Sequence, residues 1–139
     1  VGWDLYGGVG ALVPALHHAL GNNSHIHSVE SARVMATSGQ VTFGDDVHFH
    51  IGLVGNLVDT LPQPDVVVLD PPRVGAGADV VTRIAARKPK RVIHIGCDPA
   101  TFATDIRAWS QAGYHLSDIV VVNAFPGTHH FETLGLLQP

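Results

Sequence analysis

The sequence is poor in cysteine and has no long apolar run, and each shortage excludes a class of protein. A single cysteine, Cys97, among 139 residues cannot form an internal disulfide, which excludes a disulfide-stabilised scaffold and favours a reducing cytoplasm. No apolar run approaches the roughly 20 residues that a membrane-spanning helix needs, so we expect no membrane partner. The opening residues also lack the basic stretch and apolar core of a secretory signal.

Charge is scarce as well. Only 14% of the residues are charged and the net charge is −4, which argues against a domain that grips nucleic acid by itself, because phosphate binding needs a basic face. The hydrophobic fraction of 45% indicates a folded chain. The length is that of one domain, which we expect to span 1–139 and, since it opens directly on a strand, to be a piece of a longer protein.

Short β-like runs alternate with helical stretches along most of the sequence. The runs "PDVVVLD" and "RVIHIG" lack polar alternation, as expected for parallel strands covered on both faces, so we predict a doubly wound α/β sheet. The tail "DIVVVNAFPGTHHFETLGLL" has two strands and no helix between them, which predicts an antiparallel hairpin at the sheet edge. The expected strands are 2–6, 25–29, 41–43, 65–69, 91–95, 118–123 and 131–137, and the expected helices are 10–20, 31–37, 76–87 and 100–112.

Ligands of such sheets lie beyond the carboxyl ends of the strands, so the residues after each strand are the candidates. The first strand leads into "DLYGGVG", which holds Asp4, Tyr6, Gly7, Gly8 and Gly10. Glycines let the backbone turn tightly and let a ligand approach the next helix. The spacing differs from the G-x-G-x-x-G dinucleotide fingerprint, which argues against a nicotinamide cofactor. The turn could also be purely structural.

Acidic residues follow the next two expected strands. Glu30 lies about 20 residues beyond the glycine loop, where a carboxylate can accept hydrogen bonds from ribose hydroxyls. The alternative is a carboxylate that favours the positive end of the helix dipole. Asp45 or Asp46, in "FGDDV", could receive an adenine amino group, and a plain turn is an equal alternative.

The fourth and fifth strands end on a stiff loop and on the lone thiol. Two prolines in "LDPPRVGAG" stiffen the loop and hold Asp70 at the sheet edge. Cys97 directly follows its strand, and Asp98 or Thr101 could cap the next helix. A thiol near a helix N-terminus forms thiolate readily and can attack electrophilic carbon, although a free cysteine is often only a buried apolar residue.

Histidines and an acid in the tail complete the candidates. On an extended "HHFE" segment His130 and Glu132 share one face, so Glu132 could serve as a general base, or both could be ordinary polar residues of an edge strand. The pairs His25/His27 and His48/His50 each share a face of an extended segment, but the cysteine is distant and no H-E-x-x-H occurs, so we expect no resident metal.

Four of these segments together resemble the S-adenosylmethionine-dependent RNA uridine-C5 methyltransferases, and only the C-terminal catalytic domain of that family. "DLYGGVG" is similar to D-L-[FY]-C-G-x-G, "LDPPRVGAG" to D-P-[PA]-R-x-G, "GCDPATFATD" to S-C-[ND]-P-A-T-x-x-R-D and "FPGTHHFE" to F-P-x-T-x-H-x-E. Gly7 stands where the family often has a cysteine, Gly96 replaces serine and Thr104 replaces arginine.

The resemblance implies a Rossmann-like class I methyltransferase sheet and a set of roles. Cys97 would add to C6 of a uracil, Glu132 would remove the C5 proton, and Asp70 would lie between cofactor and base. The cofactor would be S-adenosylmethionine, and the partner would be RNA, with rRNA favoured over tRNA and bound with the help of an absent N-terminal domain. The implied cofactor residues are Asp4, Tyr6, Gly7, Gly8, Gly10, Glu30, Asp45, Asp46 and Asp70, and the implied substrate residues are Arg73, Thr101 and His130.

Two alternatives stay open at this point. Methyltransferases that act on an exocyclic amine usually place an aromatic residue after Asn/Asp-Pro-Pro, whereas Arg73 follows the prolines here, and they do not need Cys97. A non-catalytic remnant could keep the fold without binding the cofactor.

Overall fold

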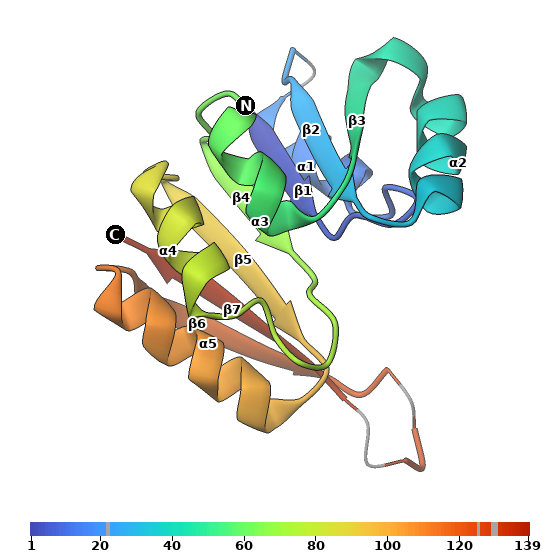
Figure 1. The fold of residues 1–139 in the computed structure, drawn as a ribbon. Coiled ribbons are helices and arrows are strands. Elements are labelled where there is room, and N and C mark those ends of the chain that lie inside the picture. Colours follow the sequence, from blue (N-terminus) through green and yellow to red (C-terminus); the bar gives the residue numbers. More distant parts are fainter. Residues whose placement is uncertain (22, 125, 129–130) are drawn as a thin grey trace.

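The computed structural model describes residues 1–21, 23–124, 126–128 and 131–139, and its centre is one seven-stranded sheet in the order β3-β2-β1-β4-β5-β7-β6 (Figure 1). The strands are β1 Gly2–Leu5, β2 Ile26–Glu30, β3 Val47–Ile51, β4 Val66–Leu69, β5 Arg91–Gly96, β6 His115–Val122 and β7 Glu132–Gln138. The helices are α1 Val13–Leu20, α2 Arg33–Phe43, α3 Val54–Leu57, α4 Ala78–Ala86 and α5 Pro99–Gln111, with 3-10 turns η1 Gly44–Asp46 and η2 Val58–Thr60.

The strand directions confirm the predicted doubly wound sheet and its terminal hairpin. β1 to β5 pair in parallel, whereas β7 runs antiparallel to both β5 and β6. β7 therefore lies between β5 and β6, and β6, whose eight residues are all exposed, forms the sheet edge. None of the helices in the described part of the chain is long and apolar enough to cross a membrane.

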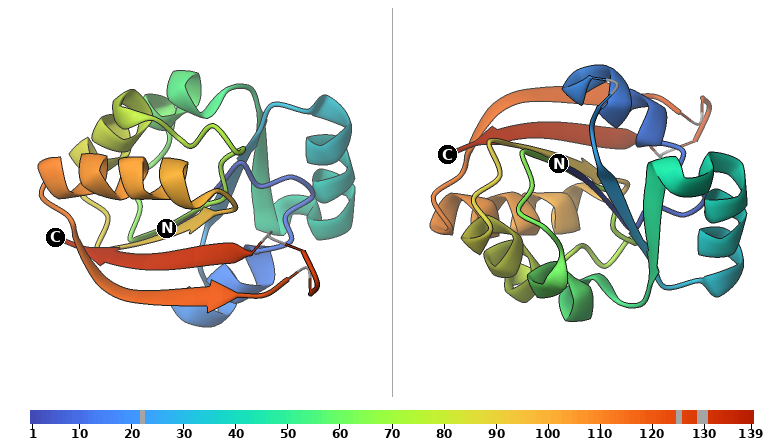
Figure 2. Two further views of the ribbon diagram at one scale, coloured as in Figure 1. Left: turned by 90° about the horizontal axis from the view of Figure 1, so that it is seen from below. Right: turned by 90° about the horizontal axis from the view of Figure 1, so that it is seen from above.

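The sheet is covered on both faces, which explains its unbroken apolar strands. α1 packs against one face, and α3, α4 and α5 pack against the other (Figure 2). The α1 side buries Val13 and Leu16 against Ile26, Val68 and Ile95. The opposite side holds a larger core, with Trp3, Leu5, Val67, Leu69, Ile84, Val92 and Trp109 fully buried.

The prediction of a strand at 41–43 is wrong, because these residues end α2. The ring of Phe43 packs against that of Phe49 with centroids 6.2 Å apart, and Gly44, at φ 58°, ends the helix. A three-residue β-branched and aromatic run is too short to override the helix around it. The third strand is instead β3, and α3 and η2 after it were not predicted.

Histidines of β2 and β3 gather on one sheet face. His27 Nδ1 lies 3.0 Å from His50 Nε2, and the His27 ring also stacks on His48 at 5.0 Å. Burial, followed by the neighbouring histidines, lowers the pKa of His27 to about 4 and also lowers the pKa of His50. Within the described ranges, no group of three or more histidine, cysteine or acidic side chains is arranged to hold a metal ion.

The lowered pKa of His27 predicts a loss of stability in acid. The folded state binds this proton more weakly than the unfolded chain, so the free energy of unfolding falls as the pH drops from about 6.5 towards 4. We expect His27→Gln to lose about 1 kcal/mol less than the wild type between pH 7 and 5, allowing for partial exposure. Urea unfolding at both pH values measures this. His115→Gln, at an exposed β6 position, is the control, and an equal loss in both variants contradicts the expectation.

Candidate active site

One face of the sheet leads towards the predicted site. Register pairs Asp4 with Ser28 and Val68, Val68 with Ile93, and Ile93 with Leu136. Residues paired across strands point to the same face, and so do residues two apart along a strand. The row that contains Asp4 therefore lies on the α1 side of the sheet.

The same face continues to the carboxyl edge of the parallel strands, where it presents Glu30, Asp70 and Cys97. The backbone N–H of Asp70 donates to Leu5 O over 3.2 Å, which extends the ladder beyond β4. Because β7 is antiparallel, its first residue, Glu132, lies at this edge too.

Cys97 and Glu132 are brought together by the β5–β7 register. Gly96 pairs with Thr133, so one further step of the register sets Cys97 opposite Glu132. Directly opposed residues of an antiparallel pair face the same side of the sheet. The part-buried thiol and the carboxylate therefore share one side, although they are far apart in the sequence.

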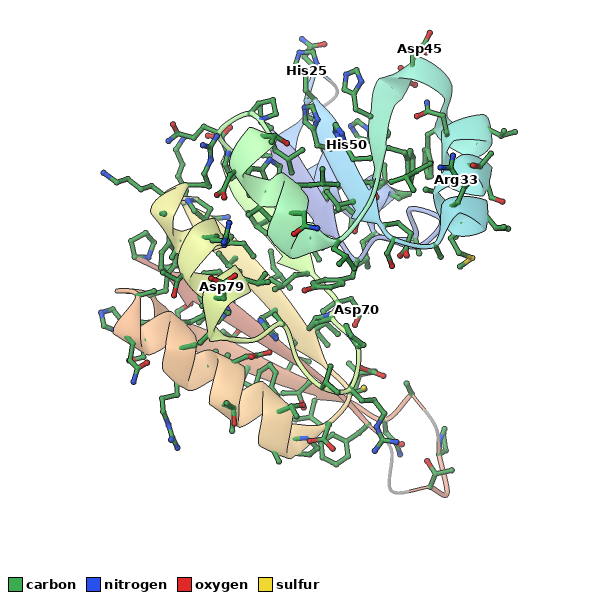
Figure 3. The ribbon with its side chains drawn as sticks, viewed as in Figure 1. His25, Arg33, Asp45, His50, Asp70 and Asp79 are labelled. Atoms are coloured by element: carbon green, nitrogen blue, oxygen red, sulfur yellow. The ribbon has the colours of Figure 1, made fainter. Side chains whose placement is uncertain are left out.

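Glu132 lies close enough to Asp70 to feel its charge. Burial raises the pKa of Glu132, and the Asp70 charge raises it further. The pKa of Asp70 is also raised by burial. Figure 3 shows Asp70 on the loop beyond β4, at the carboxyl edge of the sheet.

The glycine loop after β1 has a backbone that tolerates few side chains. Tyr6, Gly8 and Gly10 have φ of 61°, 57° and 85°, in the left-handed region. A Cβ at position 7 would overlap the Ser28 hydroxyl and the Asp4 carboxylate. At Gly7 and Gly8 the loop therefore exposes its backbone, without side chains, to a ligand at the carboxyl edge of the sheet.

Glu30 joins this loop to α2. Its Oε2 accepts from the N–H of Gly8 over 3.0 Å, and its Oε1 accepts from the N–H of Ala32 over 2.6 Å. The carboxylate is thus held at the rim of the glycine loop, and it also satisfies a donor at the start of the next helix.

Asp4 is a buried acid with an unused oxygen. Its side chain is 1% exposed, its Oδ2 accepts from the Ser28 hydroxyl over 3.1 Å, and its Oδ1 has no partner among the described residues. Burial raises its pKa to about 6, opposed by the Ser28 hydrogen bond and supported by the charges of Asp70 and Glu30. Such a group favours a donor or a cation supplied from outside the chain.

Beyond Cys97, α5 begins with a complete cap. The Asp98 carboxylate accepts from the N–H groups of Ala100 and Thr101, both over 3.0 Å, and Pro99 occupies the first turn. The Thr101 backbone hydrogen bond is the largest cause of the lowered pKa of Asp98. Of the two caps predicted, Asp98 is the one used.

The two predicted substrate residues that the structure describes tie the Asp70 loop to α5. The Thr101 hydroxyl donates to the carbonyl of Arg73 over 2.8 Å. The Arg73 guanidinium, which is 68% exposed, lies 3.9 Å from the Asp98 carboxylate. The exposed Arg73 guanidinium can therefore bind an anion from solvent, whereas the Thr101 hydroxyl already donates to a backbone carbonyl of the chain.

Two other predicted positions do not join this group. Asp45 and Asp46 form η1 before β3, not after a strand, so the placement predicted for them is wrong. Figure 3 shows Asp45 at the end of the sheet opposite Asp70, near His25. The error follows directly from the misplaced third strand. His130 and its neighbour His129 lie outside the described residues.

Known RNA methyltransferases are similar to this chain in sequence. A model of the tRNA (Uracil-5-)-methyltransferase family matches residues 23–139. The chain belongs to this family. An uncharacterised RNA methyltransferase of Corynebacterium efficiens is 56% identical over 98% of the chain, and one of Corynebacterium glutamicum is 53% identical over 98%. The matched regions are 32% and 33% of those proteins, so the chain spans about a third of their length.

A solved structure of the same family agrees with the fold. The tRNA (uracil-54, C5)-methyltransferase of Pyrococcus abyssi, in complex with S-adenosyl-L-homocysteine, superimposes with a TM-score of 0.80 and 27% identity. The similarity covers 98% of this chain and 33% of that protein. Fibrillarin from Aeropyrum pernix, at 14% identity and a TM-score of 0.75, shares the class I methyltransferase fold alone.

A buried polar set on the opposite face of the sheet from Cys97 was not predicted from the sequence. His94 of β5 and Asp105 and Trp109 of α5 are at most 3% exposed and contact one another. Two signals were present. His94 interrupts an otherwise apolar strand, and Asp105 ends the motif that contains Cys97.

The α5 cap predicts a measurable contribution to stability next to the thiol. Asp98→Ala removes the acceptor for two backbone N–H groups, which typically costs about 1 kcal/mol in the free energy of unfolding. Asp98→Asn keeps a side-chain oxygen at the cap and serves as the matched control, with a smaller loss. Urea unfolding of the wild type and both variants measures these losses. An Asp98→Ala variant as stable as the wild type would show that the cap contributes nothing.

Proposed function

We propose that residues 1–139 form the catalytic domain of an S-adenosylmethionine-dependent RNA methyltransferase that methylates C5 of a uridine. The observation that supports it best is the register that sets the Cys97 thiol opposite the Glu132 carboxylate. A nucleophile and a base on the same side of one edge are what the chemistry at uracil C5 needs. The proposed location is the cytoplasm, where the thiol stays reduced.

The residues around the glycine loop fit the cofactor. S-adenosylmethionine supplies an electrophilic methyl group on a positively charged sulfur. The orphaned Oδ1 of Asp4 can accept from its ammonium directly or through water, and the bare backbone at Gly7 and Gly8 lets its chain approach. Glu30, already placed at the rim, retains lone pairs for ribose hydroxyls.

The thiol begins the reaction. Uracil C5 is a weak nucleophile, so the Cys97 thiolate first forms a bond from Sγ to C6. The C5–C6 π electrons then move to C5 and O4 as an enolate. The bound cofactor would supply the methyl group to this C5 electron pair, and its sulfur would keep the electrons of the methyl–sulfur bond.

The carboxylate ends the reaction. Glu132 takes the proton from C5, whose C–H electrons re-form the C5–C6 double bond while the bond to Cys97 breaks and releases thiolate. A raised pKa suits Glu132 to this role, because a general base works best when its pKa approaches the working pH. We propose that Asp70, whose charge raises the pKa of Glu132, lies between the cofactor and the base.

The proposed substrate is RNA, and this chain supplies only part of the binding affinity for it. The net charge is −4, and relatives about three times as long contain further sequence. We propose that an RNA-binding domain outside 1–139 provides most of the affinity and that Arg73 adds a local phosphate contact. Access to the base requires a flipped or unpaired uridine. The preference for rRNA over tRNA stays a prediction.

Trapping the covalent intermediate tests the mechanism. RNA with 5-fluorouridine has no C5 proton to remove, so the full encoded protein with cofactor should accumulate an adduct at Cys97 by mass spectrometry. Glu132→Gln should accumulate a similar adduct on ordinary RNA, because its base is missing. Cys97→Ala should form none. Methylation that persists in Cys97→Ala would favour exocyclic-amine chemistry instead, and adducts on rRNA and tRNA substrates compare the two RNA classes.

The buried carboxylate of Asp4 predicts a pH dependence of cofactor binding. Its pKa is about 6 without ligand, and a cationic ligand should lower it, so binding weakens as the pH falls through 6. We expect the Kd of S-adenosylmethionine to rise about tenfold between pH 7 and 5. Calorimetric titration measures this.

Asp4→Asn should flatten this profile, and Asp118→Asn, on exposed β6, should retain it. The same pH slope in both variants contradicts the role given to Asp4. No heat at millimolar ligand in the wild type would favour a non-catalytic remnant.

A further inference from the structure

The buried polar set of His94, Asp105 and Trp109 lies on the sheet face opposite Cys97. His94 and Trp109 are fully buried and Asp105 is 3% exposed. Trp109 Nε1 donates to His94 Nδ1 over 3.0 Å, and His94 Nε2 lies 3.3 Å from Asp105 Oδ2 in a geometry short of a regular hydrogen bond. Burial of polar groups costs free energy unless they are well paired, so packing alone does not explain three polar side chains in this core.

The indole fixes the state of the imidazole. An indole N–H can only donate, so His94 Nδ1 must accept and cannot carry a proton. The ring proton of His94 is therefore on Nε2 and points towards Asp105. The order Trp109, His94, Asp105 is a directed chain from α5 to β5 and back to α5.

Asp105 continues the chain into the loop that contains Asp70 and Arg73. Its Oδ2 accepts from the N–H of Ala76 over 2.7 Å and its Oδ1 from the N–H of Gly77 over 3.0 Å. Gly75, at φ 84°, lies against the same carboxylate, and a Cβ there would come within 2.7 Å of Oδ2. The carboxylate thus holds both oxygens against the backbone of the loop.

We propose that His94 and Asp105 are positioning residues that fix the loop 70–77, and with it Asp70, relative to Cys97. This inference rests on the proposed function, because it concerns the same reactive edge. His94 lies three residues before Cys97 on one strand, and Asp105 contacts the loop that follows Asp70. The Thr101–Arg73 hydrogen bond ties the near end of that loop to α5, and Asp105 ties the far end.

The polar set is suited to orientation more than to stability. An apolar group of similar volume would often fill a core site with equal or greater stability than a buried ionic group. It would not accept two backbone N–H groups at once, which is what sets the path of the loop. Misplacement of reacting groups by about 1 Å can cost on the order of 100-fold in rate.

Asp105→Asn tests the proposal with little change in volume. Asparagine has one acceptor oxygen, so one of the two loop N–H groups loses its partner. In the full encoded protein, at a temperature where each variant is fully folded by circular dichroism, we measure the single-turnover rate of adduct formation on 5-fluorouridine RNA at saturating RNA and cofactor. We expect that rate to fall about 100-fold, with the Kd of S-adenosylhomocysteine unchanged within about threefold.

Asp79→Asn is the matched control, because this exposed acid opens α4, directly after the same loop, and its carboxylate pairs only with Arg83 among the described residues (Figure 3). It should react at the wild-type rate. If Asp105→Asn does not fold, Trp109→Phe decides, because it removes the indole donor and keeps an aromatic ring; its expected loss of rate is about tenfold.

The outcomes separate the two proposals. A wild-type rate in Asp105→Asn, or in Trp109→Phe where that variant decides, overturns the positioning role and leaves the Cys97 mechanism intact. A slow rate accompanied by an equal weakening of cofactor binding also overturns it, because the defect would then be in binding. Absence of an adduct in the wild type with cofactor bound overturns the proposed function, and the positioning role with it.

Discussion

The antiparallel pairing of β7 with β5 is the constraint on which the reactive edge depends. In a wholly parallel sheet every strand would begin at the far edge, and a residue at the start of a strand could not reach the side where Cys97 lies. Because β7 is reversed, its first residue arrives beside the last residues of β5. Gly135 of β7 allows α5 and β6 to pack closely against this strand, since a Cβ there would come within 2.9 Å of Leu116 and 3.1 Å of Phe102.

The edge so formed is rich in acids that share a limited volume. Burial raises the pKa of Asp4, Asp70 and Glu132, and the charge of Asp70 raises the pKa of Asp4 and Glu132 further. Such a site favours a positively charged ligand and disfavours bare phosphate. It suits a sulfonium cofactor, and it agrees with the proposal that sequence outside 1–139 provides most of the affinity for RNA.

The sequence predicted the parts of the molecule that follow local rules. Unbroken apolar runs such as Val66–Leu69 indicated buried parallel strands, and Cys97, Asp70 and Glu132 were predicted as site residues because they stand at strand ends in recognisable motifs. The error at 41–43 arose because Val41 and Phe43 favour strands locally while α2 and its end at Gly44 decide the outcome. Asp45 and Asp46 were misplaced with it.

The contacts of His94 with Asp105 and Trp109 could not be predicted, because they depend on how α5 lies on the sheet. The opposition of Cys97 and Glu132 likewise needs the pairing register, which no local pattern reveals.

A disulfide trap tests that register most directly, since the chain has only one cysteine to begin with. Under mild oxidation, Glu132→Cys should form an intramolecular disulfide with Cys97, seen by mass spectrometry of unreduced peptides, because opposed side chains on one face come within bonding range. Thr133→Cys should not, because its side chain faces α5. A disulfide in Thr133→Cys and none in Glu132→Cys would contradict the account.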